Sequence, residues 1–217
     1  MVSKRIRFIS SLININDKVL DIGTDHAFLP IYLIKNNITT IADGSDLSSN
    51  VLKSANENVR KYSLEDNIKL FLSDGIKSID ISKYNTFVIA GMGFHTIKEI
   101  LSNGNLKNIN KMIIQSNNNY EELRKFVNKI GYRIIKDYYI QDKNKTYLIL
   151  LIQKGKQQLT DIEYACGIYD KNNEWYYSYI IEKYKKILNK LPDKNDSNIN
   201  SLINYYTKYL SIGKIEE

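Results

Sequence analysis

Residues 19–30 read VLDIGTDHAFLP, and this stretch decides the fold of the chain. Apolar residues open a short strand that ends at Asp21 and Gly23, and an apolar helical pattern starts at Ala27. A strand that leads through a glycine turn into a helix is typical of the ligand-binding turn of an open α/β sheet. Ligands of such sheets lie beyond the carboxyl ends of the strands, so we expect one near residues 21–26.

Alternating strand and helix patterns follow along the chain. Residues 3–12 have an amphipathic helical pattern that precedes the first strand, at residues 19–22. We expect the later strands at residues 39–42, 68–72, 86–90, 111–115, 133–140 and 146–153, and the intervening helices at residues 46–62, 94–101 and 120–130. The last two strands are close enough for a hairpin. The pattern predicts an α/β fold, namely the Rossmann-like methyltransferase sheet of seven mostly parallel strands with one antiparallel strand.

The chain changes character after residue 155. Thr160 and Glu163 form a capping-box pattern, which predicts the start of a helix. Apolar residues then step by three and four at Ile180, Tyr184, Ile187 and Leu191, and again at Ile199, Ile203, Tyr206 and Leu210. This spacing predicts an antiparallel coiled-coil-like helix pair, which either packs on the first domain or clamps RNA. We therefore expect a Rossmann-like domain at residues 1–155 and a small helical domain at residues 156–217.

Composition limits the class of protein. No apolar run reaches the roughly 18 residues of a membrane span, and the N-terminus lacks the apolar stretch of a signal peptide. Cys166 is the single cysteine, so no intrachain disulfide can form, and His26 and His95 are too few for the usual zinc site. We expect a cytoplasmic monomer without a metal and without a membrane partner.

The positive charge of the chain is concentrated in its first part. Residues 1–155 hold 22 basic and 15 acidic residues, whereas residues 156–217 hold nine of each, so the first part carries the whole net charge of +7. A basic excess of this kind fits a nucleic-acid partner and equally fits an ordinary basic surface. Lys4, Arg5 and Arg7, beside the first strand, are the candidate RNA contacts.

Four predicted strand ends carry residues suited to a nucleoside cofactor. The candidate cofactor-binding residues are Asp21, Gly23, Asp46, Asp74, Gly75, Gly91, Met92 and Gly93. A carboxylate after the second strand suits the two hydroxyls of a ribose, and Asp46 is favoured over Asp43 because it immediately precedes the next helix. Asp74 is placed to accept a hydrogen bond from the adenine amino group, with the Gly75 N–H nearby.

The residues after Gly23 distinguish between two cofactors. A dinucleotide site needs the pattern G-x-G-x-x-G around a pyrophosphate, but the positions after Gly23 include Asp25 and Ala27, and Asp25 stands where this pattern has its second glycine. The negative charge of a carboxylate repels a pyrophosphate, whereas it is compatible with the positive sulfonium of S-adenosylmethionine or attracts it. The sequence therefore predicts S-adenosyl-L-methionine. Asp25 is also a candidate for the N-cap of the next helix, a role that is compatible with a position beside the sulfonium.

At this point the chain resembles a known family. The segments SKRIRFISSL, VLDIGTDHAFLPIYLI, SDGI and IAGMG, within residues 3–153, resemble the bacterial tRNA (adenine-22-N1)-methyltransferases of the TrmK type. The motif DIGTDHAFLP is specific because other methyltransferases carry glycine where Asp25 stands. That family is similar in having a Rossmann-like catalytic domain followed by a helical coiled-coil-like domain. The chain departs from it at Phe94, in place of the last glycine of G-M-G-G, and at Ser116, in place of the proline of Q-P-N.

The resemblance implies that tRNA is the substrate and that N1 of an adenine attacks the methyl group. Neutral adenine has a lone pair on N1, so the reaction needs alignment and no general base. The product ring is cationic, and Asp25 is the candidate catalytic residue that stabilises it, with His26 positioning Asp25 or contacting the RNA. N1 is buried in a paired duplex, so the base must be unpaired or flipped.

Three other functions remain open from the residues alone. The same fold could methylate another RNA or a protein, or the chain could be a non-catalytic RNA-binding protein that retains the sheet. A nicotinamide-dependent oxidoreductase is the third, and the missing glycines oppose it. The sequence Gly91-Met92-Gly93 stands where amino-directed methyltransferases have N/D-P-P-Y, which agrees with a ring nitrogen as the target.

Overall fold

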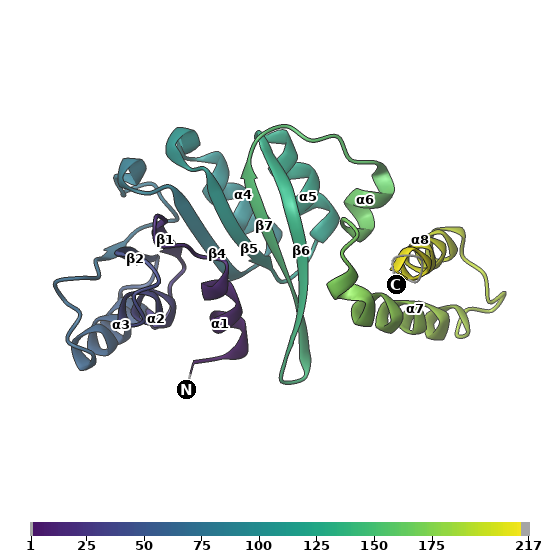
Figure 1. Ribbon diagram of the computed structural model, residues 1–217, viewed down its shortest axis with the longest axis horizontal. Helices are drawn as coiled ribbons and strands as arrows, with labels where there is room; N and C mark the ends of the chain where they lie inside the picture. Colours follow the sequence, from purple (N-terminus) through teal and green to yellow (C-terminus); the bar gives the residue numbers. More distant parts are fainter. Residues whose placement is uncertain (1, 214–217) are drawn as a thin grey trace.

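A seven-stranded mixed sheet forms the centre of the molecule (Figure 1). The computed structural model describes residues 2–213. The strands lie in the order β3-β2-β1-β4-β5-β7-β6, and only β7 runs antiparallel to its neighbours. This order confirms the expected methyltransferase variant of the doubly wound sheet.

The elements alternate along the chain as the sequence predicts. The strands are Lys18–Ile22 (β1), Ile41–Asp46 (β2), Leu70–Leu72 (β3), Thr86–Met92 (β4), Lys111–Ser116 (β5), Tyr132–Asp142 (β6) and Lys145–Lys154 (β7). The α-helices are Lys4–Ser11 (α1), Phe28–Lys35 (α2), Ser49–Lys61 (α3), Phe94–Ser102 (α4), Tyr120–Lys129 (α5), Asp161–Cys166 (α6), Glu174–Leu188 (α7) and Ser197–Gly213 (α8). No helix within residues 2–213 is long and apolar enough to cross a membrane.

The second strand lies later in the chain than expected. It was predicted at residues 39–42, but β2 continues through Gly44 to Asp46, and α3 starts after its N-cap Ser48. Glycine and serine are turn residues by composition, yet here they pair with β1 on one side and β3 on the other. Asp46 is therefore the last residue of a strand and not the first residue of a helix.

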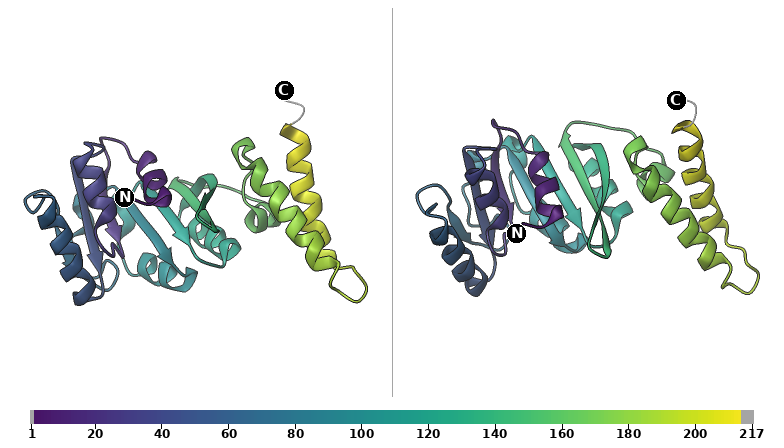
Figure 2. Two further views of the ribbon diagram at one scale, coloured as in Figure 1. Left: turned by 90° about the horizontal axis from the view of Figure 1, so that it is seen from below. Right: turned by 60° about the horizontal axis from the view of Figure 1, so that its bottom comes forward.

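Two layers of helices cover the sheet. Helices α1, α2 and α3 pack on one face, and α4 and α5 pack on the other (Figure 2). The central strands β1, β4 and β5 are buried between these layers, which explains the run of apolar residues in the middle of each strand. This arrangement leaves the carboxyl ends of the parallel strands as the edge at which a ligand can reach the sheet.

Helices α7 and α8 form an antiparallel pair that stands out from the β6 side of the sheet (Figures 1 and 2). The capping box of Thr160 and Glu163 is present at the start of α6, as predicted. The inner face of the pair differs from the predicted one, because Ile187 is exposed and Leu188 is buried. Tyrosines occupy much of the inner face, including Tyr177 and Tyr206. The predicted face of α7, which was drawn mainly through aliphatic residues, is therefore rotated about the helix axis relative to the buried face.

A buried ion pair joins the helical segment to the sheet. Arg124 on α5 and Asp137 on β6 lie 3.4 Å apart, Nε to Oδ2, and their side chains are 1% and 0% exposed. The Arg124 guanidinium donates to the carbonyls of Tyr164 at 2.9 Å and Ala165 at 3.3 Å, and the Ile168 N–H donates to the Asp137 carboxylate at 2.8 Å. Both charges are satisfied only when residues 164–168 are in place, so this contact holds the helical segment against the sheet.

Candidate active site

Two adjoining cavities lie at the carboxyl ends of the parallel strands. The larger has a volume of about 1130 Å³ and the smaller about 130 Å³. Gly23, Asp46 and Met92 line both of them. Three of the four predicted strand ends thus meet at the boundary between the two cavities, and the fourth, with Asp74 and Gly75, lines the smaller one.

The turn after β1 is tied to the neighbouring strand. The backbone N–H groups of Gly23 and Thr24 both donate to the carbonyl of Ser45, at 2.8 and 2.9 Å. The Thr24 hydroxyl donates to Asp21 Oδ2 at 2.8 Å. A Cβ atom on Gly44 would lie within 2.9 Å of the Thr24 side chain, so only glycine leaves room for this contact. Sequence reasoning missed Gly44 because the strand was expected to end before it.

Asp21 is a buried carboxyl group with an unusual pKa. Burial raises its pKa from 3.8 to about 7, and the Thr24 hydrogen bond and the positive charge of Arg5 only partly offset this effect. Near neutral pH the group is therefore divided between its neutral and charged forms. A cation bound beside it would favour the charged form, because opposite charges lower a carboxyl pKa.

Substitution of Asp21 by asparagine should make the fold less sensitive to pH. The folded-state pKa of Asp21 lies above its unfolded value, so the free energy of unfolding falls as pH rises from about 4 to about 7. The full shift corresponds to about 4 kcal/mol. Asp21→Asn lacks this charge, so its stability relative to the wild type should increase over that range and then level off. Urea unfolding of both proteins at several pH values measures this, and a pH-independent difference would contradict it.

Asp25 stands exposed at the mouth of the larger cavity. Its side chain is 70% exposed, and its φ of 52° lies in the left-handed region. The interpretation of Asp25 as the N-cap of α2 is wrong, because Ala27 occupies that position and provides no side-chain cap. His26 lies beside it, with Nε2 3.5 Å from Asp25 Oδ1, but is not among the residues that line the cavity. The turn therefore presents Asp25 without engaging it in capping the helix.

Asp43 and Asp46 have different surroundings. Asp43 is buried, and its two oxygens accept from the Tyr84 hydroxyl at 2.7 Å and the Lys69 N–H at 2.8 Å. Asp46 accepts from the Ser48 N–H through Oδ1 at 2.8 Å, and its Oδ2 accepts no hydrogen bond from residues 2–213. Only Asp46 lines the cavities. This contrast favours Asp46 as the ribose contact and assigns Asp43 to the core.

Alanine substitutions of these two aspartates should have different effects. Asp46→Ala should weaken S-adenosylmethionine binding by roughly 1.5–3 kcal/mol, the range for hydrogen bonds to a charged group. Asp43→Ala leaves the Tyr84 hydroxyl and the Lys69 N–H without their acceptor, so it should mainly lower thermal stability. Isothermal titration calorimetry and thermal unfolding of both variants test this. A larger loss of binding in Asp43→Ala would reverse the assignment.

The remaining predicted cofactor residues lie around the smaller cavity. Asp74 and Gly75 line it together with Met92, although the Asp74 carboxylate also pairs with Lys77. Gly91 lines the larger cavity, whereas Gly93 is the N-cap of α4 and lines neither. Phe94, which departs from the family pattern, is buried in the core, with its ring centroid 6.2 Å from that of Phe126. The departure at Phe94 therefore does not change the lining of either cavity.

The three predicted RNA contacts do not form one exposed patch. Lys4 and Arg7 are exposed on α1, but Arg5 turns into the larger cavity. Arg5 Nη1 donates to Gln115 Oε1 at 2.8 Å, and its guanidinium carbon lies 5.1 Å from the centre of the Tyr147 ring. Arg5 differs from the expectation because its position on α1 faces β5 and β7 instead of solvent.

Sequence reasoning missed a polar network on the wall of the cavity. Gln115 Nε2 donates to Asn117 Oδ1 at 3.1 Å, and Asn117 Nδ2 donates to the Gly91 carbonyl at 2.8 Å. With Arg5, this network connects α1, the end of β5 and the end of β4. The position of Gln115 and Asn117 at a strand end could have identified them. Tyr147 could not be found in this way, because its place depends on the pairing of β7.

The strand order and the acidic cleft define the class of this protein as a class I methyltransferase. This cleft consists of the two adjoining cavities that share Asp46, carries the carboxylates of Asp21 and Asp25, and has no glycine-rich pyrophosphate turn after β1. Within the described residues, no three His, Cys, Asp or Glu side chains are grouped to hold a metal ion.

Comparisons with known proteins give the family. Residues 2–150 match the Methyltransferase domain family. The tRNA (adenine(22)-N(1))-methyltransferase of Bacillus subtilis is 30% identical over 156 residues, which cover 71% of this chain and 66% of that protein. The structure of M. capricolum TrmK in complex with S-adenosyl-homocysteine is 32% identical, covers 99% of both chains and has a TM-score of 0.79. That of Streptococcus pneumoniae Sp1610 with S-adenosyl-L-methionine is 25% identical, covers 97% of this chain and 100% of that one, and has a TM-score of 0.83. The chain belongs to the TrmK family of tRNA (adenine-22-N1)-methyltransferases.

Proposed function

We propose that this protein transfers the methyl group of S-adenosyl-L-methionine to N1 of adenine 22 in tRNA. The observation that carries the proposal is the position of Asp25, whose carboxylate is exposed at the mouth of the cleft, in the predicted cofactor turn. The family supports it, since B. subtilis and M. capricolum relatives carry this activity or name. We expect the protein to act as a monomer in the cytoplasm.

The lining of the two cavities suits this cofactor. The smaller cavity, with Asp74 and Gly75, would hold the adenine ring, and Asp46 at the boundary of the two cavities would face the ribose. Asp21 and Gly23 would lie beside the amino-acid part. The free Oδ2 of Asp46 can accept from a ribose hydroxyl. The carboxylates of this region favour a positively charged ligand and oppose a pyrophosphate. When bound, S-adenosylmethionine supplies a methyl group activated by its positive sulfur.

The residues of the chain contribute alignment and charge to the reaction. The N1 lone pair of neutral adenine forms the new bond to the methyl carbon while the bond from that carbon to sulfur breaks, and no proton moves. The positive charge passes to the adenine ring. Asp25 is placed at the mouth of the cleft, where its negative charge can stabilise that developing charge. His26 is close enough to Asp25 to orient its carboxylate.

The larger cavity provides the space for a base that has left its stack. N1 is not accessible in a base pair, so adenine 22 must be unpaired or flipped before it reaches Asp25. Aromatic side chains suit the faces of such a base. The aromatic residues that line the larger cavity are Phe28, Tyr62, Tyr120 and Tyr147.

Methyl transfer to defined transcripts tests the proposal. Purified protein and labelled S-adenosylmethionine should methylate an unmodified tRNA transcript that has adenine at position 22. A transcript with guanine at that position should accept no label. Cofactor binding without transfer to RNA would support a methyltransferase for another substrate, and the absence of cofactor binding would support the non-catalytic alternative.

A further inference from the structure

We propose that Asn117 recognises the target adenine through hydrogen bonds to its N6 amino group and to N7, an inference that rests on the proposed function. Asn117 follows directly after β5, is exposed and lines the larger cavity. Its backbone N–H donates to the Met92 carbonyl at 2.9 Å, and its Nδ2 donates to the Gly91 carbonyl at 2.8 Å. Because Met92 lines both cavities, these contacts place Asn117 near the boundary between them.

The reaction decides which edge of adenine the protein can recognise. N1 must face the methyl group, so a side chain cannot occupy N1 with a hydrogen bond during the transfer. The edge formed by N6 and N7 stays accessible, and it presents one donor and one acceptor. An asparagine amide matches this edge, with its oxygen accepting from N6 and its nitrogen donating to N7. An asparagine on the wall of the cavity can therefore hold the base without blocking N1.

The Asn117 side chain has the hydrogen-bonding capacity that this contact needs. Its Oδ1 accepts from Gln115 Nε2 at 3.1 Å, which uses one of two lone pairs. Its Nδ2 donates one of two hydrogens to the Gly91 carbonyl. Within residues 2–213 the side chain makes no further hydrogen bond. One acceptor position and one donor thus remain for a ligand in the cavity.

The orientation of the Asn117 amide is fixed from both ends. The Arg5 guanidinium can only donate, so its 2.8 Å contact directs Gln115 Oε1 toward Arg5. Gln115 Nε2 then donates to the Ser116 carbonyl at 2.8 Å and to Asn117 Oδ1 at 3.1 Å. At the other end, the Gly91 carbonyl can only accept, so it selects Nδ2 of Asn117. Gln115 is 1% exposed, so the protein and not the solvent sets this orientation.

The fixed orientation gives selectivity for adenine. An amide that could rotate would present its nitrogen to O6 of guanine or hypoxanthine as readily as its oxygen to N6 of adenine. In the orientation that Gln115 imposes, Asn117 Oδ1 would meet O6 of these bases as a second acceptor, and the two oxygens would repel each other. Asn117 is therefore the residue that touches the base, whereas Gln115 and Arg5 are positioning residues that hold its amide.

A purely structural role fits Asn117 less well than it fits the next residue. Asn118 Oδ1 accepts from the Phe94 N–H at 3.0 Å at the start of α4, and Asn118 lines neither cavity. The backbone N–H of Asn117 already ties the end of β5 to the Met92 carbonyl. The Asn117 side chain is thus not required to join the two strand ends, and it is the asparagine of this pair that faces the cavity.

A modified transcript tests the contact without changing the protein. A tRNA that carries 7-deazaadenine at position 22 keeps N1 and the amino group but has a C–H in place of N7. The substitution does not make N1 a weaker nucleophile, so a slower reaction reports lost recognition. The wild type should methylate this tRNA with a kcat/KM roughly five- to tenfold lower than that for the adenine transcript, because one of the two hydrogen bonds is lost.

Substitutions of the amides test which residue makes the contact. Asn117→Ala should lower kcat/KM for the adenine transcript roughly 10–100-fold, the discrimination expected of a bidentate contact, and should methylate the 7-deazaadenine transcript equally well. Gln115→Leu frees the Asn117 amide to rotate, so it should reduce the effect of 7-deazaadenine without abolishing it. S-adenosylmethionine affinity and thermal stability of Asn117→Ala should stay close to those of the wild type.

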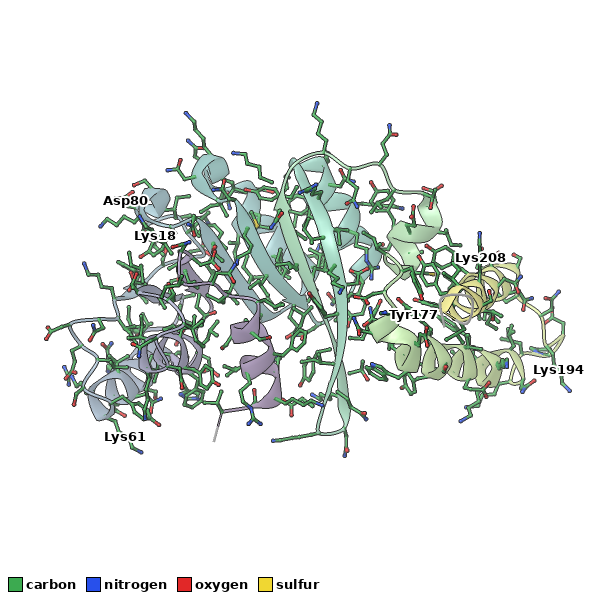
Figure 3. The ribbon with its side chains drawn as sticks, in the orientation of Figure 1. Lys18, Lys61, Asp80, Tyr177, Lys194 and Lys208 are labelled. Atoms are coloured by element: carbon green, nitrogen blue, oxygen red, sulfur yellow. The ribbon has the colours of Figure 1, made fainter. Side chains whose placement is uncertain are left out.

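Asn85 provides a matched control at the opposite edge of the sheet. Its Oδ1 accepts from the Lys18 N–H at 2.8 Å and its Nδ2 donates to the Asn16 carbonyl at 3.1 Å, so this amide also joins two segments. Figure 3 shows Lys18, the first residue of β1, toward the top of the molecule, whereas the β6–β7 turn lies at the bottom. Asn85→Ala should keep the wild-type kcat/KM and the full effect of 7-deazaadenine.

The outcomes separate this inference from the proposed function. If the wild type methylates no adenine 22 transcript, the proposed function fails. If it methylates the adenine and 7-deazaadenine transcripts equally well, N7 is not recognised and the inference is wrong. A full effect of 7-deazaadenine in Asn117→Ala would also overturn it, because another residue would then contact N7. Equal losses of S-adenosylmethionine affinity and turnover in Asn117→Ala would assign Asn117 to the cofactor instead.

Discussion

Replacing Asp137 by alanine should lower the free energy of unfolding by about 3–5 kcal/mol, the cost of breaking a buried ion pair from one side. The substitution leaves the Arg124 guanidinium 1% exposed and without its carboxylate. It also removes the acceptor of the Ile168 N–H, which holds the chain just after α6. A loss of this size is a large fraction of the stability of a typical domain. Urea unfolding of the wild type and the variant measures it.

A double substitution distinguishes the charge effect from a general loss of packing. Asp137→Leu together with Arg124→Met removes both charges, so it should be less destabilising than Asp137→Ala alone. Gly167 provides an independent check of the same contact. Its φ is +90°, and a Cβ atom there would lie 2.1 Å from Asp137 Oδ2, so Gly167→Ala should also destabilise. A decrease in the free energy of unfolding below about 1 kcal/mol for Asp137→Ala would contradict the role of this ion pair in holding the helical segment against the sheet.

Replacing Asp25 by asparagine should lower the turnover number by roughly 10²–10³-fold, the effect of removing one preorganised electrostatic contact to a transition state. Asparagine keeps the shape of the side chain and removes its charge. The Asp25 carboxylate is exposed and does not cap α2, so the fold and the S-adenosylmethionine affinity should change little. Single-turnover methyl transfer and calorimetry on the same preparation give the two quantities separately.

His26 provides the matched control for Asp25. Its imidazole lies 3.5 Å from the carboxylate but does not line the cleft, so His26→Ala should reduce turnover by a smaller factor than Asp25→Asn. Equal losses of cofactor affinity and turnover in Asp25→Asn would assign Asp25 to the cofactor site instead. In that case no side chain of the turn after β1 would stabilise the positive charge of the methylated base.

Local patterns predicted the parts of this protein that depend on neighbouring residues. The turn after β1, the hairpin of β6 and β7 and the capping box at Thr160 could all be recognised because each is contained in a short segment. The choice of Asp46 over Asp43 rested on position alone, and the hydrogen bonds of Asp43 to Tyr84 and Lys69 now give it a physical reason.

Contacts between distant segments could not be predicted in this way. Arg5 was expected at the surface, but its side chain meets Gln115, which is 110 residues away in the sequence. The ion pair of Arg124 and Asp137 depends on how α5, β6 and the segment after α6 come together.

The most direct test of the central claim is to map modified nucleosides in tRNA from cells that lack this protein. Mass spectrometry of tRNA fragments should show that 1-methyladenosine at position 22 is lost, while other modifications remain. Expression of the wild-type protein should restore it, and expression of Asp25→Asn should restore it poorly. Unchanged 1-methyladenosine at position 22 in the deletion strain, or loss of a different modification, would contradict the proposed function.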